Sequence, residues 1–432
     1  MSASRQINLN TLYQIAGKSL AVIFGFLSVI FLRRTLGLSG FGNYIYIISY
    51  IAIFVTLSDF GTHLVSVKQA SQKQKIQSKI LGNVLMLRTV FSLIASLLAL
   101  LIGLFAFQKN INLCLLSLPL IILTTFKSSL LIVFHTKLKL YFSAIHEILI
   151  AFFLFLVSWH LYLTEGTLSL YLISANLIYL FLSFPFLYFA LKIVSLNFIP
   201  NANIQKKIIT QSLPLAGILL LYTLYSKIDN ILLEFITGSE SLGIYGVSYK
   251  IYENLILPSA YLMNSVLPIM AKKLISKNKN LFNNLFQKTA DVLIFFALIL
   301  TPLIYILAPF LTAIIVGSPA PLETRTLRIL ILALPFAFLN HLAGYTIITI
   351  NQQAKSLIIS FFALIFNFTA NLLLIPKFSF AAAAANTVLT QLLVLILSFW
   401  VIYNKRGISL SLISWPKTFY LFVKKKGRVF DE

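Results

Sequence analysis

Long apolar stretches separated by short polar segments run along the whole chain. Each stretch approaches the roughly 20 apolar residues that a helix needs to cross the hydrocarbon of a bilayer. The pattern therefore predicts twelve membrane-spanning helices, with no connection long enough to form a soluble catalytic domain. The predicted helices cover approximately residues 10–32, 41–65, 82–106, 112–134, 145–163, 169–191, 212–236, 244–270, 290–315, 327–349, 356–375 and 379–402.

The composition supports an all-α polytopic membrane protein. Hydrophobic residues make up 59% of the 432 residues and charged residues only 10%, whereas soluble domains contain roughly 45–50% apolar and about 25% charged residues. These values exclude a cytosolic enzyme, a secreted disulfide scaffold and a disordered chain. The single cysteine, Cys114, has no partner for a disulfide or a metal site, so we expect no metal and no cofactor.

The basic residues predict the orientation of the chain in the membrane. A net charge of +23 on a soluble protein would suggest nucleic acid, but here the basic residues lie mostly between apolar stretches, and no nucleic-acid partner is expected. Of the 34 Lys and Arg, five lie within predicted spans, six on one side and the remaining 23 on the side of the N-terminus. By the positive-inside rule, both termini are cytoplasmic. The six on the opposite side are Arg33, Arg34, Lys109, Arg325, Arg328 and Lys377.

A further apolar segment, 408–423, is interrupted by Pro416 and Lys417 and is followed by three lysines. It is short for a comfortable span. We expect it to form a helix on the membrane surface, anchored by Trp415, Phe419 and Tyr420, with the lysines near anionic headgroups.

An internal echo indicates that the chain is a repeat of two halves. The spacing Gly37-x4-Gly42-x-Tyr44 after the first predicted helix recurs as Gly238-x4-Gly243-x-Tyr245 after the seventh. Six crossings return the chain to its starting side, so the halves would be two six-helix lobes related as parallel repeats. Transporters built in this way place their site at the midplane between the halves. We expect lobes at 1–200 and 201–403, followed by a basic tail at 404–432.

Ionisable side chains inside membrane spans are costly, which makes each a candidate for function. The candidate cations, which would contact an anionic substrate, are Lys18, Arg88, Lys127, Lys227 and Lys250. Three of these cations also have alternative interpretations that do not involve a substrate. Lys18 belongs to a stripe of small and polar residues that could instead pack against another helix, with its ammonium reaching toward headgroups. Arg88 and Lys127 could also reach the cytoplasmic headgroups.

Acidic and aromatic residues complete the candidate site. The candidate acids, for charge balance or ion coupling, are Asp59, Asp229 and Glu253, and the candidate sugar contacts are Tyr222, Tyr245, Tyr249 and Tyr252. Asp59 could equally cap a helix end. The acids near Lys227 and Lys250 could simply neutralise those lysines, and the tyrosines could serve in packing. Asn340 with His341, and Asn367 with Asn371, could face a sugar, but we expect them to hydrogen-bond between helices.

Three stretches carry a resemblance to a known family: FLRRTLGLSGFGNYIYIISY, LSDFGT and SKIDNILLEFITGSESLGIYGVSYKIYENLILP. They resemble the polysaccharide-exporter branch of the multidrug/oligosaccharidyl-lipid/polysaccharide (MOP) superfamily, in kind the Wzx-type O-antigen flippases. The resemblance implies a MATE-like fold with a cationic cavity. It also implies movement of undecaprenyl-diphosphate-linked oligosaccharide from the cytoplasmic to the periplasmic leaflet of a bacterial inner membrane. A polysaccharide polymerase and a chain-length regulator are the partners such a role would involve.

Other functions compete with this interpretation. A flippase for the peptidoglycan precursor shares the chemistry, and a multidrug or cation antiporter shares the fold, although its cavity would favour acidic residues. A membrane-embedded glycosyltransferase or polymerase would need a sizeable extramembrane loop with catalytic carboxylates, and the predicted connections contain none. We therefore expect a transporter and not an enzyme.

Overall fold

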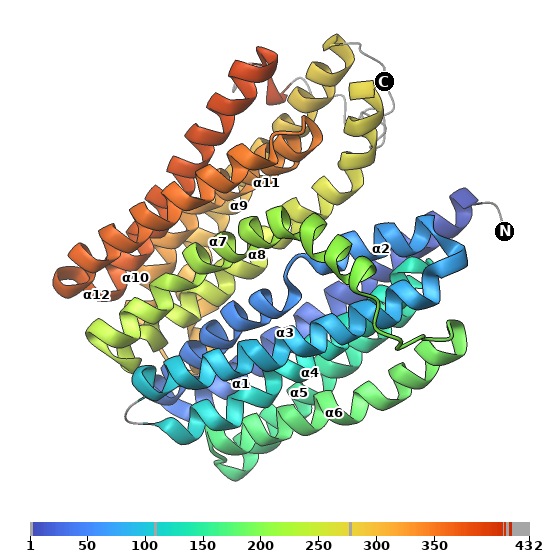
Figure 1. The fold of residues 1–432 in the computed structure, drawn as a ribbon. Coiled ribbons are helices and arrows are strands. Elements are labelled where there is room, and N and C mark those ends of the chain that lie inside the picture. Colours follow the sequence, from blue (N-terminus) through green and yellow to red (C-terminus); the bar gives the residue numbers. More distant parts are fainter. Residues whose placement is uncertain (1–2, 108–109, 276–278, 409, 412–413, 417–432) are drawn as a thin grey trace. The chain divides into compact units, whose positions relative to one another are not determined.

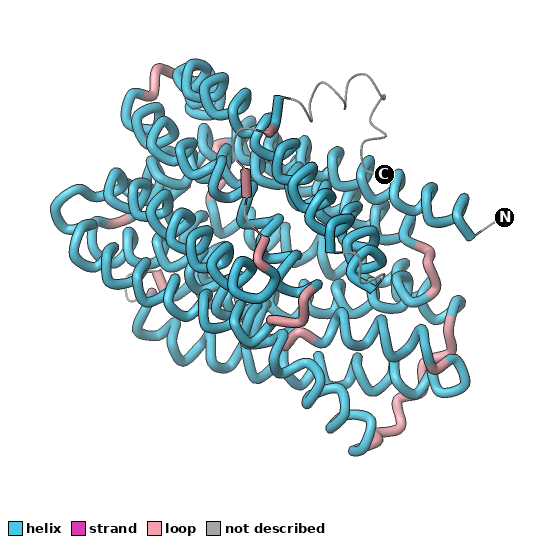
Figure 2. The backbone as a smooth tube through the Cα atoms, turned by 90° about the horizontal axis from the view of Figure 1, so that it is seen from above, coloured by secondary structure: helices cyan, strands magenta, loops and turns pink. Residues whose placement is uncertain are grey.

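The computed structural model describes residues 3–107, 110–275, 279–408, 410–411 and 414–416. Within these residues every regular element is helical, and Figure 2 shows only helices joined by loops, which confirms the all-α fold class. The α-helices are α1 Ala3–Asp59, α2 Thr62–Gln72, α3 Gln77–Ala106, α4 Ile111–Thr136, α5 Leu140–Thr164, α6 Leu168–Ile193, α7 Ala202–Thr237, α8 Ser239–Ile275, α9 Lys279–Val316, α10 Pro321–Leu330, α11 Leu334–Thr349 and α12 Gln353–Arg406. Two 3₁₀ turns, Gln74–Ile76 and Ile331–Ala333, join neighbouring helices.

The long apolar helices make this a multi-pass membrane protein, although the helices of the structure do not correspond one to one with the twelve predicted spans. Nine helical stretches of the described residues are long and apolar enough to cross a membrane. Two of the nine, in α1 and α12, contain a non-helical residue at Gly37 and Ser379. These breaks coincide with the predicted boundaries between the first two and the last two spans. Twelve segments result only if both are divided there and α8, which is not among the nine, is added.

The two glycines of the repeated motif occupy the same kind of backbone position. Gly37 has φ 67° and interrupts α1, and Gly238 has φ 84° and separates α7 from α8. An L-residue with a side chain is disfavoured in this left-handed region, whereas glycine enters it freely. The motif therefore marks a sharp helix-to-helix turn in each half, and the aromatic residue seven positions later, Tyr44 or Tyr245, is buried in both halves.

Two predicted helices are divided in the structure: 327–349 is interrupted by the 3₁₀ turn Ile331–Ala333, and 41–65 is interrupted near its end. The expected helix over 41–65 ends at Asp59, because Phe60 and Gly61 both have positive φ and α2 starts a new direction at Thr62. At Gly61 an added Cβ would lie 2.9 Å from the backbone nitrogen of Ala216 on α7. The close approach of α7, together with the left-handed backbone, explains why an apolar stretch that reads as one helix is divided here.

The chain forms two compact units, Met1–Ile231 and Leu232–Glu432. Their boundary lies inside α7, whereas the sequence analysis places the lobe boundary at 200/201. In unit 1 (Met1–Ile231), α1 packs against α5, α3 against α4, and α4 against α6, as can be followed from blue to green in Figure 1. In unit 2 (Leu232–Glu432), α11 contacts α8, α9 and α12, and α10 packs on α8.

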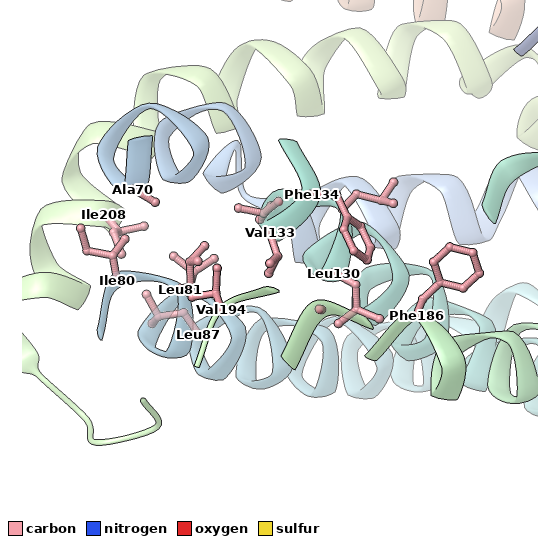
Figure 3. Packing of buried hydrophobic residues seen from close by; sticks show 14 residues of the cluster. Ala70, Ile80, Leu81, Leu87, Leu130, Val133, Phe134, Phe186, Val194 and Ile208 are labelled. Carbon is pink, nitrogen blue, oxygen red and sulfur yellow. The ribbon is translucent and has the colours of Figure 1, made fainter. Parts of the chain in front are cut away.

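The core of unit 1 is a continuous apolar cluster on α3, α4 and α6. Figure 3 shows Leu130, Val133 and Phe134 of α4 beside Leu81 and Leu87 of α3, with further members from α6. The loop after α6 lies on the start of α3, where the Asn83 side chain donates to the Ile199 carbonyl at 3.1 Å and accepts from the Asn201 amide at 2.8 Å. These contacts fix the ends of the helices that carry the polar residues described below.

Amide side chains join the helices of unit 2. Asn340 of α11 donates from Nδ2 to the carbonyl and the Oε1 of Gln391, at 2.9 and 2.7 Å. Across the break in α12, Asn367 donates to Thr390 Oγ1 at 3.2 Å. Asn371 donates to Asn367 Oδ1 at 3.0 Å within the same helical segment, before the break. The expected hydrogen bonds between helical segments are therefore present for Asn340 and Asn367, and those of His341 and Asn371 stay predictions.

The start of the tail packs on α9. The Trp415 ring lies 5.9 Å from the Phe295 ring, and the Ser414 hydroxyl donates to Asp291 Oδ1 at 2.7 Å. Residues 409, 412–413 and 417–432, which include ten of the sixteen residues of the predicted surface helix, and Lys109 lie outside the described residues. The interfacial helix therefore stays a prediction.

Candidate functional site: a charged cluster within unit 1

Arg88 of α3 is the best-defined charged group inside the membrane-spanning helices. Its side chain is only 1% exposed, yet its guanidinium meets polar groups from three helices. Nη1 donates to Asp59 Oδ1 at 2.6 Å and to Thr62 Oγ1 at 3.0 Å, and Nε donates to Ser129 Oγ at 2.7 Å. Nη2 donates to the Ser128 hydroxyl. The sequence analysis names Arg88 and Asp59 in separate roles, and the structure brings them together as an ion pair.

The local backbone explains how this cluster forms. α1 ends at Asp59, so its carboxylate stands beside the turn at Phe60 and Gly61, and the Thr62 hydroxyl donates back to the Asp59 carbonyl at 2.6 Å. On α4, the adjacent Ser128 and Ser129 hydroxyls both donate to the Thr125 carbonyl, at 3.0 and 2.7 Å. Each hydroxyl therefore uses its proton locally and keeps a lone pair for the guanidinium.

Two histidines that the sequence analysis did not single out extend the cluster. His63 Nε2 lies 3.3 Å from His135 Nδ1, and the rings meet edge to face at 82°. Arg88 and Asp59 are electrostatic neighbours of His63, and Lys18 is a neighbour of His135. The histidine pair therefore lies within electrostatic range of the Arg88–Asp59 pair on one side and of Lys18 on the other.

Lys18 is half-buried on α1 at the contact with α5. The close helix approach occurs at its neighbour Gly17, where an added Cβ would lie 2.6 Å from Ala144 Cβ. Gly25 belongs to the same stripe of small and polar residues as Lys18, two helical turns further along α1, and it has no neighbouring atom within 4 Å of such a Cβ. Within the described residues, no other helix therefore packs closely against the stripe at Gly25.

Lys127 of α4 is half-buried and lies over an aromatic ring. Its Nζ is 5.7 Å from the centroid of Tyr179 on α6, a cation–π geometry. His146 of α5 is an electrostatic neighbour of Lys127. The His146 ring stacks on Phe186 with centroids 3.9 Å apart, and neither ring nitrogen has a hydrogen-bond partner among the described residues. The imidazole thus packs here as an aromatic ring.

The candidates of α7 differ in their surroundings. Asp229 is buried, with 3% exposed, whereas Lys227 is half-buried. The next residue, Asn230, donates to Ser49 Oγ of α1 at 2.7 Å. Tyr222 is 50% exposed and packs edge to face on Tyr225, with centroids 5.2 Å apart. Among the four candidate tyrosines, Tyr222 is therefore accessible in this structure.

The α8 candidates lie in unit 2. Lys250 Nζ donates to Glu253 Oε2 at 2.8 Å, one helical turn along, so mutual neutralisation describes this pair. Tyr245, Tyr249 and Tyr252 stack successively along the helix. Tyr245 and Tyr252 are buried, and the Tyr245 hydroxyl shares a 3.0 Å hydrogen bond with Thr387. Tyr245 and Tyr252 therefore pack in the interior of unit 2 and are not open to a sugar in this structure.

Taken by position, four of the five candidate cations, Lys18, Arg88, Lys127 and Lys227, lie in the helices of unit 1. Of these, Arg88 has its charge balanced by an ion pair at 2.6 Å. No group of three or more His, Cys, Asp or Glu side chains that could hold a metal ion occurs within the described part of the chain.

The fold agrees with those of known membrane transporters. An inward-facing multidrug resistance MATE family transporter of the MOP superfamily superposes with a TM-score of 0.75 at 13% identity, covering 91% of this chain and 98% of the other. The lipid II flippase MurJ, in an inward closed conformation, also gives 0.75, at 14% identity, covering 96% and 92%. A MOP superfamily transporter from Pyrococcus furiosus gives 0.61 at 13% identity, covering 93% and 96%. At these identities the likeness establishes the MOP-type fold and not the substrate.

The family follows from the sequence models. The model described as polysaccharide biosynthesis protein matches residues 8–274, more than half of the chain, and a second model, MatE, matches residues 214–373. The chain belongs to the polysaccharide biosynthesis protein family, which confirms the polysaccharide-exporter resemblance read from the sequence motifs. Among curated proteins, no relative matches the chain.

Proposed function

We propose that the protein is a flippase for undecaprenyl-diphosphate-linked oligosaccharide, the repeat unit of an O-antigen or a related surface polysaccharide. It would move this lipid from the cytoplasmic to the periplasmic leaflet of a bacterial inner membrane, with both termini in the cytoplasm. The observation that carries the proposal is the match of the polysaccharide biosynthesis protein family over residues 8–274. A polysaccharide polymerase and a chain-length regulator would act on the delivered lipid.

The chemistry of the substrate explains why a protein is needed. Each sugar hydroxyl that enters hydrocarbon without a hydrogen-bond partner costs a few kcal/mol, so spontaneous crossing of an oligosaccharide is negligible. The prenyl tail can remain in lipid throughout. The protein therefore needs to supply only a hydrated, cationic cavity that opens to one face of the membrane at a time. Outward movement of the negatively charged diphosphate also follows an inside-negative potential, by about 2.3 kcal/mol per charge per 100 mV.

The embedded charges of unit 1 support an anionic substrate. Lys18, Lys127 and Lys227 are half-buried rather than sealed in the core, so their ammonium groups are the ones we assign to the diphosphate. Arg88, fully buried and paired, would organise the helices that carry them. Asp59 and Asp229 would balance these charges or take part in ion coupling, Glu253 would do the same for Lys250 in unit 2, and Tyr222 would contact sugar.

A leaflet assay in a deletion strain tests the proposal. Lipid-linked oligosaccharide is labelled in intact spheroplasts with an enzyme that cannot cross the membrane, and the total is measured after lysis. We expect the deletion strain to accumulate the completed lipid-linked glycan while the fraction accessible from outside falls to background, and a plasmid copy to restore it. Absence of the glycan altogether would instead identify an enzyme of its synthesis.

A peptidoglycan-precursor flippase is the second candidate. The superposition of this chain on MurJ covers 92% of the MurJ chain, with a TM-score of 0.75. The same deletion strain separates the two functions. Accumulation of the peptidoglycan precursor, followed by cell lysis, would favour the second candidate. Unchanged distribution of both lipids, with increased sensitivity to cationic drugs, would favour a multidrug exporter.

A further inference from the structure

A pocket of about 1050 Å³ lies in unit 2, between the end of α9 and the start of α10. Its wall combines apolar side chains, among them Phe310, Ile329 and Leu332, with the two arginines Arg325 and Arg328. No aspartate or glutamate lines it. Neither its arginines nor its apolar wall belongs to the candidate site in unit 1, and the inference drawn from it does not depend on the proposed function.

Arg328 is held in place by a defect in α9. Pro309 has no N–H, so the Tyr305 carbonyl one turn earlier loses its usual helical partner. Arg328 Nε donates to that carbonyl at 3.3 Å, and its guanidinium carbon lies 5.0 Å from the centroid of the Tyr305 ring. Within the described residues Arg328 has no other hydrogen bond or ion pair, which leaves the two terminal nitrogens for a ligand.

Arg325 adds a second positive charge on the same helix face. It stands three residues before Arg328, so the two side chains are neighbours on α10. Arg325 is exposed, and it forms no hydrogen bond or ion pair with any residue that the structure describes. The nearby Glu323 is buried, and its backbone carbonyl accepts from Ser248. The pocket therefore has an uncompensated positive end.

The surroundings of the pocket indicate an amphiphilic ligand. Phe310 is 63% exposed and Ile306, one turn before it on α9, is 71% exposed. Such apolar exposure on a membrane-spanning helix faces lipid. Arg325 and Arg328 belong to the minority of basic residues on the side predicted to be the outer one, which places the pocket at the outer headgroup level. Arginine forms bidentate hydrogen bonds with phosphate.

We propose that this pocket binds an anionic phospholipid of the outer leaflet. The lipid phosphate lies between Arg325 and Arg328, and an acyl chain lies along Phe310, Ile329 and Leu332. A soluble phosphate would make the two charged contacts but would leave the apolar wall uncovered, and a zwitterionic phospholipid would place a cation beside the guanidinium groups. Charge complementarity and the apolar wall together select the anionic lipid.

Native mass spectrometry of the full-length protein, purified and delipidated in detergent, tests the proposal. The protein is titrated with phosphatidylglycerol or with phosphatidylcholine of the same acyl chains. We expect one phosphatidylglycerol to bind about tenfold more tightly than phosphatidylcholine, and Arg325→Gln to remove most of that preference. Ala313→Trp, which places a large ring in the apolar part of the pocket but keeps both arginines, is expected to weaken binding of the lipid. Lys377→Gln, a matched change of another cation on the predicted outer side, should bind like the parent.

Three results would overturn the inference. Equal binding of the two lipids by the parent protein would show that charge does not select the ligand. Unchanged preference in both Arg325→Gln and Ala313→Trp would place the lipid elsewhere. Full displacement of phosphatidylglycerol by millimolar inorganic phosphate would identify a soluble-anion site instead. Because Arg325 is exposed and has no partner in the described structure, its variant should fold, and glycan display by each variant is measured separately from lipid binding.

Discussion

Replacing Asp59 by Asn removes the charge that balances Arg88 while keeping the size of the side chain. The two side chains differ greatly in exposure, 1% for Arg88 and 24% for Asp59. Arg88 therefore cannot turn toward water when its partner becomes neutral. Removing one partner of a buried ion pair costs about 3–5 kcal/mol, and because Asn can still accept a hydrogen bond, we expect a loss near 3 kcal/mol.

The converse change, Arg88→Met, should cost much less. The Ser128 and Ser129 hydroxyls already donate to the Thr125 carbonyl, so loss of the guanidinium leaves no hydroxyl proton unsatisfied. Methionine fills a similar volume, and the remaining Asp59 carboxylate is partly exposed. We expect a loss of about 1 kcal/mol, within the range of volume-conserving core changes. The double variant should resemble Arg88→Met, because no unpaired buried charge remains.

Unfolding of purified protein in mixed micelles, with increasing denaturing detergent, measures these differences. Glu165→Gln, an exposed carboxylate in unit 1, is the matched control and should leave stability unchanged. Equal losses in Asp59→Asn and Arg88→Met, or a double variant less stable than both, would refute the account of Arg88 as a sealed cation. If Arg88→Met is stable but abolishes glycan display, Arg88 has a substrate role beyond the ion pair.

The remaining predictions concern substrate binding and close packing. Lys127→Gln and Lys227→Gln should each abolish surface polysaccharide while the protein accumulates in the membrane; normal display from both variants, measured by gel analysis of the glycan, would contradict the site assignment. Gly82→Ala should destabilise unit 1 by about 3 kcal/mol, because the new Cβ would lie 1.9 Å from the Asn197 carbonyl oxygen. Gly25→Ala, with nothing within 4 Å of the new Cβ, should be stabilising by up to about 1 kcal/mol; equal detergent stability of the two glycine variants would argue against the close approach.

Features set by local sequence were predictable. Apolar length predicted the spans, and the repeated glycine motif located a helix break in each half, because a left-handed backbone at Gly37 and Gly238 is a local requirement. The break after Asp59 was not predicted, because Phe60 lies in an apolar stretch that resembles an uninterrupted helix. The break at Ser379 coincides with a predicted boundary even though no glycine marks it.

Contacts between side chains of different helices were harder to predict from the sequence. The sequence places Arg88 and Asp59 near the predicted cytoplasmic ends of their helices, but depth in the membrane alone does not tell which helices are neighbours. His63 and His135 are 72 positions apart, and neither stands in a polar stripe. Their position at the same predicted inner end of two spans was the one available signal. In the pocket on α9 and α10, Arg328 is held by the Tyr305 carbonyl, which Pro309 leaves without its helical partner. The sequence shows the proline, but only the fold shows that Arg328 reaches this carbonyl.

The structure also changes how the candidate cations should be weighed. An anion approaching Arg88 meets an ion pair with no net charge, since Asp59 lies 2.6 Å from the guanidinium. Lys127 keeps its full charge, because a cation–π contact with Tyr179 holds an ammonium without neutralising it. Lys250 resembles Arg88 in having a carboxylate at 2.8 Å. The attraction for a diphosphate should therefore depend more on Lys127 than on Arg88, although Arg88 is the more deeply buried of the two.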